Sequence, residues 1–200
     1  MPPLSLDADE ADAISELFNI GMGQSAAALS AMIGEEVHLS VPALAVSSRT
    51  RIAQDLDPDS AARVCAVHGA FSGPFTGEAM LIFPERGTLA LVGRVVPVDP
   101  GADAPGEVEQ DALTEIGNII LNGCLASLSN LVEGEVAGAL PCYSTGMPTE
   151  VIGAADDPVL FVRIDVALAS GDARGQVLFL LNIASLDAFR TAVRKALESL

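Results

Sequence analysis

The 200-residue sequence is short of basic residues, with 10 lysines and arginines against 27 aspartates and glutamates and a formal net charge of −17. Lys195 is its only lysine. A protein that binds nucleic acid must neutralise phosphates with basic side chains, so this deficit excludes nucleic acid as a partner. It also argues against docking on an anionic membrane surface.

Cysteine and histidine are scarce as well. Three cysteines stand far apart without a CxxC pair, and the two histidines, His38 and His68, lie 30 residues apart with no ligand cluster around them. This spacing predicts no metal site and no cofactor bound by this chain. Cys65, Cys124 and Cys142 are therefore interpreted as small core residues of a reduced protein.

Long hydrophobic runs are missing too. No stretch of 18 apolar residues occurs, and the first residues lack a basic region followed by an apolar one. These absences predict a soluble, cytoplasmic protein without membrane contact. Half of the residues are nevertheless hydrophobic, which excludes wholesale disorder. A chain of this length can bury roughly 70% of the surface that its unfolded form exposes, so no disulfide or metal is needed for stability.

The middle of the chain separates two similar halves. Residues 97–106 contain three prolines and two glycines, which cannot continue a helix or a central strand. At an offset of 99, eleven of the 31 positions from 12 to 42 are identical to those from 111 to 141, without a gap. We therefore predict one domain of two repeats, about 7–96 and 107–200, joined by a Pro/Gly-rich linker over 97–106.

Each half is predicted to form an α-β-β-β-α unit. The expected elements are long helices at 7–33 and 107–133, short strands at 37–41 and 136–140 that each end at a proline, hairpins at 62–72/76–83 and 159–169/175–181, and closing helices at 85–95 and 185–199. Gly34 and Gly134 are expected to end the long helices. The predicted fold class is α+β, with internal pseudo-twofold symmetry and a mostly antiparallel sheet flanked by the long helices.

Helical periodicity predicts which faces of the long helices are buried. The expected apolar stripes are Leu113, Ile116, Ile120, Cys124, Leu128 and Leu131 in the second half, and Ile14, Leu17, Gly21, Ala28 and Met32 in the first.

The opposite helix faces carry a repeated polar pattern, D-x3-E-x2-N-x22-P. It comprises Asp12, Glu16, Asn19 and Pro42 in the first half, and Asp111, Glu115, Asn118 and Pro141 in the second. If the repeat served only folding, the core would be kept and the solvated face would vary, yet here the polar trio is identical. The prolines are explained most simply as strand terminators. Each aspartate could favour the N-terminal half of the helix dipole, shape the site, or touch a partner.

A carboxylate and a carboxamide on one helix face suit a particular chemistry. Asparagine is a poor base, but its amide can hold a water by donating and accepting hydrogen bonds. Positioning a water is the requirement in hydrolysis of phosphoryl groups. The glutamate could act as a base or pair with a lysine of a partner. Because the chain has no metal cluster, phosphate-binding glycine loop or Ser-His-Asp set, the site calls for a macromolecular substrate that brings its own phosphate and metal.

Two segments resemble a known signature. Glu-Leu-Phe-Asn-Ile-Gly-Met-Gly at 16–23 and Glu-Ile-Gly-Asn-Ile at 115–119 resemble the paired active-site motifs of the CheC-type chemotaxis phosphatases, the family of CheC, CheX and FliY. One departure is visible, because the residue before the asparagine is Gly117 in the second copy, as in the family, but Phe18 in the first.

This resemblance implies hydrolysis of the aspartyl phosphate of a CheY-type response regulator. It implies that Asn19 and Asn118 orient the attacking water, that Glu16 and Glu115 contact a lysine of the regulator, and that the regulator binds the Mg²⁺. The receptor deamidase CheD is a further candidate partner, and the internal repeat favours a monomer.

Two other functions compete with this hypothesis. A non-catalytic module could bind a response regulator or CheD without hydrolysis, as the FliM middle domain, which resembles this fold, lacks the catalytic pair. Hydrolysis of a small phosphorylated metabolite is a weaker alternative, because neither motif has phosphate-binding basic residues nearby.

Overall fold

The computed structural model describes residues 8–40, 42–56, 62–132, 134–182 and 186–198. Its elements are α1 (Ala8–Ile33), β1 (Val37–Leu39), β2 (Ala43–Ser48), α2 (Arg49–Leu56), β3 (Val64–Ser72), β4 (Gly77–Pro84), α3 (Glu85–Val92), α4 (Glu107–Val132), β5 (Ala137–Gly138), β6 (Cys142–Gly146), α5 (Pro148–Ile152), β7 (Pro158–Leu168), β8 (Arg174–Asn182) and α6 (Leu186–Glu198).

The strands form a single curled sheet in which every pairing is antiparallel. Its order is β1-β7-β8-β4-β3-β5, with β2 also pairing β7 and β6 also pairing β3. The two long hairpins, β3–β4 and β7–β8, meet in the middle through β4 and β8. Outside them, β1 and β2 pair with a strand of the second half, and β5 and β6 pair with a strand of the first.

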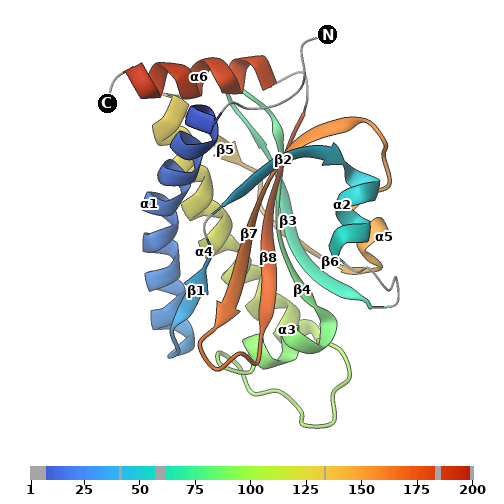
Figure 1. The fold of residues 1–200 in the computed structure, drawn as a ribbon. Helices are drawn as coiled ribbons and strands as arrows, with labels where there is room; N and C mark the ends of the chain where they lie inside the picture. Colours follow the sequence, from blue (N-terminus) through green and yellow to red (C-terminus); the bar gives the residue numbers. More distant parts are fainter. Residues whose placement is uncertain (1–7, 41, 57–61, 133, 183–185, 199–200) are drawn as a thin grey trace.

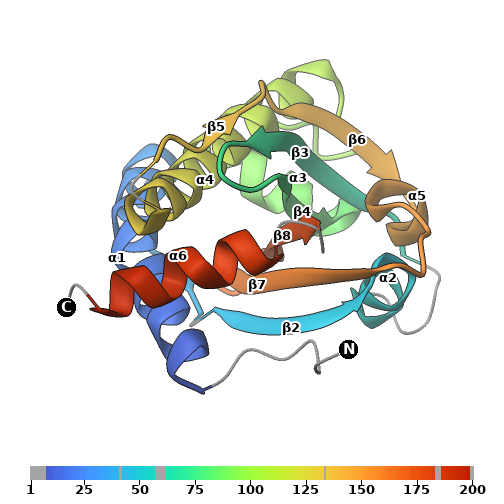
Figure 2. The same cartoon turned by 90° about the horizontal axis from the view of Figure 1, so that it is seen from above.

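Helices cover both faces of this sheet. The long helices α1 and α4 pack side by side and run in opposite directions along one face, and α6 crosses their ends (Figures 1 and 2). The main core lies between these helices and the sheet, where Phe75, Phe179 and Phe189 are fully buried. The short helices α2 and α5 cover part of the opposite face through Ile52 and Ile152, which pack on a smaller core.

The predicted α+β class with an antiparallel sheet and long helices is confirmed. The α-β-β-β-α element order was incomplete, because the stretch interpreted as irregular in each half contains a strand and a short helix, β2–α2 and β6–α5. Within the described residues these two strands each pair along one side only, β2 with β7 and β6 with β3. Strands at a sheet edge need no continuous apolar run, so their sequence signal is weak.

The prolines lie at the junction between consecutive strands, which differs from the predicted strand ends. The strand β1 stops at Leu39, three residues before Pro42, and β2 begins directly after that proline. In the second half, β5 stops at Gly138 and Pro141 directly precedes β6. The two prolines therefore redirect the chain from one short strand into the next.

The apolar stripe of α4 is confirmed, since Leu113, Ile116, Ile120, Cys124 and Leu128 are buried; the side chain of Leu131 lies outside the described residues. In α1 the stripe was wrong where it can be checked. Ala28 is exposed and Met32 only partly buried, whereas Met22, Ser25, Leu29 and Ile33 are buried. Three consecutive alanines at 26–28 give the helix little periodicity, so its buried face was misplaced by one position.

A serine near the end of each long helix holds the strand that follows. Ser30 accepts a hydrogen bond from the backbone N–H of Val37 at 3.0 Å, and Ser129 accepts one from Val136 at 2.9 Å. All four residues belong to the repeated identities. Gly34, as predicted, follows α1 with a positive φ of 70°.

Candidate functional site

The repeated polar residues lie on the solvent-facing sides of α1 and α4. Asp12, Glu16 and Asn19 are exposed along α1. On α4 Asp111 and Glu115 are exposed, and Asn118 is half-buried. Because the intervening α4 residues Leu113 and Ile116 are buried against the sheet, packing fixes which way this polar face points. Each copy therefore presents a carboxylate and a carboxamide three residues apart, on one side of a firmly packed helix.

In the first copy Asn19 borders an open groove of about 170 Å³. Its walls come from the next turn of α1, through Met22 and Gly23, and from the end of the following strand, through Leu39 and Ser40. The groove leaves room beside the Asn19 amide for a water molecule or a phosphoryl oxygen.

In the second copy the space beside Asn118 is almost closed, at about 10 Å³. Asn122, one turn further along α4, donates a hydrogen bond from Nδ2 to Oδ1 of Asn118 at 2.8 Å. Pro141 lines the same space, together with Gly138 of β5. Asn118 and Pro141, which are 23 residues apart in the sequence, therefore line the same pocket.

Asn122 was not assigned to the site from the sequence, although it lies one turn after Asn118 on the same side of α4. The signal was its spacing, because residues four apart on a helix are neighbours. At the offset of 99, the equivalent of Asn122 is Gly23, which has no side chain to engage Asn19. Gly23 therefore cannot supply the hydrogen bond that Asn118 receives, and other lining residues differ as well, such as Ala26 beside Asn19 and its equivalent Leu125 beside Asn118.

Gly117, the residue before Asn118, lies against the sheet. A Cβ atom at this position would stand 2.5 Å from Cγ1 of Val67 on β3, so only glycine allows α4 to approach the strand this closely. The side chain of its counterpart, Phe18, lies outside the described part of the chain. Of the remaining motif residues, Pro42 is buried beside the β1–β2 junction.

Across the described residues, no group of three or more His, Cys, Asp or Glu side chains could hold a metal ion. In the same part of the chain, no helix combines the length and apolar character needed to cross a membrane.

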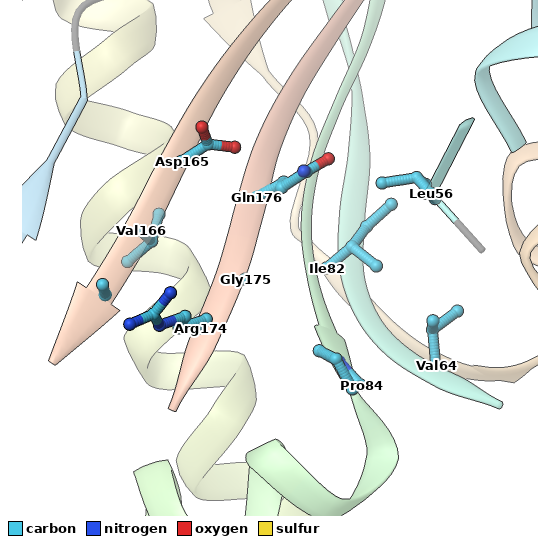
Figure 3. A pocket seen from close by; sticks show the side chains of 10 residues that line it. Leu56, Val64, Ile82, Pro84, Asp165, Val166, Arg174, Gly175 and Gln176 are labelled. Atoms are coloured by element: carbon cyan, nitrogen blue, oxygen red, sulfur yellow. The ribbon is translucent and has the colours of Figure 1, made fainter. Parts of the chain in front are cut away.

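A larger cavity of about 350 Å³ lies away from the repeated residues (Figure 3). It opens between the ends of β7, β8 and β4 and the end of α2, where Leu56, Val64 and Ile82 form apolar walls. None of the eight motif residues lines this cavity, so we do not assign it to the candidate site.

Comparison with known proteins gives a consistent set of relatives. Residues 10–46, which span the first motif, match the model of the CheC-like family. The chain is 26% identical over 167 residues to the flagellar motor switch phosphatase FliY of Bacillus subtilis, covering 82% of this chain and 43% of FliY. It is also 26% identical over 150 residues to the CheY-P phosphatase CheC of the same organism, covering 72% of this chain and 70% of CheC.

Solved structures share the fold. FliY of Thermotoga maritima superposes with a TM-score of 0.75 at 17% identity, covering 96% of this chain and all of that one. The FliM middle domain from H. pylori gives 0.68 at 10% identity, over 94% and 99% of the two chains. CheX from Borrelia burgdorferi, in its complex with CheY, BeF3 and Mg²⁺, gives 0.56 at 17% identity, over 84% and 96%.

The matched segment, the two curated relatives and the shared fold together support a CheC-like protein. They point to the family of CheC, CheX and FliY. The chain spans less than half the length of the FliY relative.

Proposed function

We propose that this chain hydrolyses the aspartyl phosphate of a CheY-type response regulator. The observation that carries the proposal is the duplicated Glu-x2-Asn pair, displayed on the solvent face of both long helices in a fold shared with CheC-like proteins. Two relatives are named phosphatases, one of them a CheY-P phosphatase, and a solved CheX is complexed with CheY.

In each site the asparagine and the glutamate have separate roles. The Asn19 and Asn118 amides each hold a water in line with the phosphorus, accepting from its O–H with Oδ1 and donating with Nδ2. Glu16 and Glu115 each pair with a lysine of the regulator and set its position on the helix. Mg²⁺ bound by the regulator would neutralise charge on the phosphoryl oxygens, so this chain need not bind a metal. Asp12, Asp111 and the two prolines shape the site.

The repeat itself is part of the proposal. Each half supplies α-β-β-α-β-β-α in the same order, and each half's short strands pair with the other half's hairpin. The Ser30–Val37 and Ser129–Val136 hydrogen bonds recur at the same offset. We infer a duplicated unit with pseudo-twofold symmetry, about 7–96 and 107–200 with linker 97–106, folded as one domain. A monomer then already carries two sites, and CheD stays a proposed partner.

The test is the paired substitution Asn19→Ala with Asn118→Ala. Without either amide the water loses its positioning groups, so phosphate loss from the regulator should return to the regulator's own rate, a fall of about 10²-fold or more in the acceleration. Each single variant should keep part of it. Exposed Asn130 on α4 offers a matched control, and Asn130→Ala should leave the rate unchanged. A double variant that is folded and still accelerates phosphate loss would overturn the assignment.

A non-catalytic binding module is the second candidate, favoured by the shared fold of the FliM middle domain. The two functions separate when binding and turnover are measured on one preparation. Tight binding of the phosphorylated regulator without faster phosphate loss identifies the module. Both motifs are intact in this chain, which favours the phosphatase.

A further inference from the structure

A second cluster of reactive side chains lies on the other face of the sheet, where α2 and α5 pack. It joins Cys142 at the start of β6, His68 on β3 and Glu78 on β4, three strands that neighbour one another. Cys142 and His68 are direct cross-strand partners. None of the three belongs to the repeated motifs or serves the proposed phosphatase chemistry.

The geometry of this cluster is that of a nucleophile, a base and an orienting carboxylate. Sγ of Cys142 lies 3.6 Å from Nε2 of His68. Nδ1 on the other side of the ring lies 3.1 Å from Oε1 of Glu78. With Glu78 accepting from Nδ1–H, Nε2 of the neutral ring is left to accept the thiol proton. The thiol also lies 3.5 Å from the His68 carbonyl oxygen, a weaker acceptor for the same proton.

The histidine and the carboxylate are more buried than the thiol. Cys142 is exposed, whereas the side chains of His68 and Glu78 are 23% and 26% exposed. Arg49, the first residue of α2, donates from both terminal nitrogens to Oε2 of Glu78 at 3.1 Å and also to the carbonyl oxygen of Ile152 at 2.6 Å. The hydrogen bond from His68 and the Arg49 guanidinium hold the pKa of the Glu78 carboxyl below its usual value. Glu78 is thus held as a carboxylate that can stabilise an imidazolium.

We propose that Cys142 is a modification site whose thiol, activated by His68 and Glu78, undergoes thiol–disulfide exchange with small disulfides. His68 takes the thiol proton, and the Cys142 sulfur attacks one sulfur of the disulfide. The new S–S bond forms as the old one breaks, and the departing thiolate takes a proton from the imidazolium. Cys142 is oxidised to a mixed disulfide while the small disulfide is reduced to one thiol, so no other oxidant is needed.

The other two cysteines provide internal controls. Cys65 and Cys124 are fully buried, and burial raises the pKa of the Cys124 thiol to about 12. A low-pKa, accessible thiolate is what reacts, so both should stay unmodified in the folded protein.

The experiment measures the reaction of the full chain with 4,4′-dithiodipyridine, an uncharged probe whose rate is insensitive to the net charge of −17. Released thiopyridone gives the rate, and peptide mass spectrometry gives the site. At pH 7 we expect Cys142 to react at least threefold faster in the parent protein than in His68→Gln, because the variant lacks the ring nitrogen that accepts the thiol proton. The matched control is His38→Gln, which removes the other histidine and should leave the rate unchanged.

The dependence of the rate on pH keeps the test independent of any variant's folding. A free cysteine loses about 75-fold in thiolate between pH 8 and pH 6. The parent protein should lose less than tenfold in Cys142 rate over that interval, because Nε2 of His68, 3.6 Å from the sulfur, accepts the thiol proton during the attack. A loss of tenfold or more, a His68→Gln rate within threefold of the parent, or labelling at Cys65 or Cys124 instead would overturn the proposal.

Discussion

Asn19 and Asn118 occupy repeated positions, but the side chains around them differ, most directly at the residue four positions further along each helix. Asn122 donates to Oδ1 of Asn118, and its counterpart Gly23 cannot do the same for Asn19. A donated hydrogen bond fixes the rotamer of the receiving amide and leaves one lone pair and both N–H groups for a water. The second site is therefore more strongly oriented and the first more open.

Removing Asn122 should slow the second site. In the Asn19→Ala background, where that site acts alone, Asn122→Ala should lower the maximal rate of phosphate loss by about 2–5-fold, the worth of one hydrogen bond of about 1 kcal/mol that orients the amide. The regulator concentration for half-maximal rate should not change, since Asn122 acts through Asn118. A rise in rate would show instead that Asn122 competes with the water. The converse test is Gly23→Asn in the Asn118→Ala background, where the first site acts alone. The space around Gly23 is open, so the new amide has room to orient Asn19, and the maximal rate should rise.

Glu78 gives a pH-dependent contribution to stability. His68 first and Arg49 second lower the pKa of its carboxyl in the folded state. A lowered folded-state pKa contributes stability that is complete above the unfolded value near 4.3, and this contribution disappears as the pH falls through the folded value. Glu78→Gln should therefore lower the free energy of unfolding by about 1–3 kcal/mol at pH 7, and the difference should shrink below about pH 4.

Urea unfolding of the parent protein and Glu78→Gln at pH 7, 5 and 3 measures the difference in their free energies of unfolding. The matched control is Glu36→Gln, whose carboxylate lies 3.8 Å from His38 in an exposed pair with side chains 58% and 72% exposed. It should change stability by well under 1 kcal/mol. An equal loss for Glu78→Gln at pH 3 and pH 7 would contradict the account.

At the scale of elements, α4 is packed closely on the sheet. Gly117 lets it lie directly against Val67 of β3, which sets the height of Asn118 above the sheet. Leu113 and Ile116, in the turn before Asn118, are themselves fully buried. The sequence already distinguished the two helices at this point, through Gly117 in one and Phe18 in the other.

Adding a methyl group at two helix glycines should therefore have opposite effects. Gly117→Ala should lower the free energy of unfolding by about 1–3 kcal/mol, because its Cβ overlaps Val67 and the helix must shift. Gly23→Ala should raise it by up to about 1 kcal/mol, because nothing lies within 4 Å and alanine favours a helix. Denaturant unfolding of both variants measures this pair. Equal effects would mean that α4 does not approach the sheet as closely as described.

Sequence periodicity predicted the buried face of α4 correctly and misplaced that of α1, for a physical reason. Large residues such as Leu113 and Ile120 recur at helical spacing, whereas the alanines at 26–28 could lie on either face. The edge strands β2 and β6 were missed because half-exposed strands carry no long apolar run. Contacts such as Asn122 with Asn118, or Cys142 with His68 and Glu78, depend on rotamers and strand register that no local pattern encodes.

At the scale of the whole molecule, the two halves share one sheet. The short strands β1 and β2 pair with β7, and β5 and β6 pair with β3, so each half completes the sheet of the other. Both long helices then cover the same face, and their polar sides stay open to solvent. The arrangement holds Asn19 and Asn118 on one rigid body.

The net charge of −17 does not by itself explain how the proposed partner would be recognised. A CheY-type phosphorylation site is itself acidic and binds a metal, so overall charge attraction does not drive the proposed encounter. Recognition would depend on the shape of the two helix faces and on one local pair between glutamate and lysine. The surplus acid is best explained as a solvated surface.

The central claim is tested most directly by the loss of ³²P from a phosphorylated CheY-type regulator, with and without this chain at substoichiometric concentration. The account predicts faster loss with multiple turnovers per chain, abolished in Asn19→Ala/Asn118→Ala and unchanged in Asn130→Ala. A decay curve that the parent chain does not accelerate, although it binds the regulator, would contradict it.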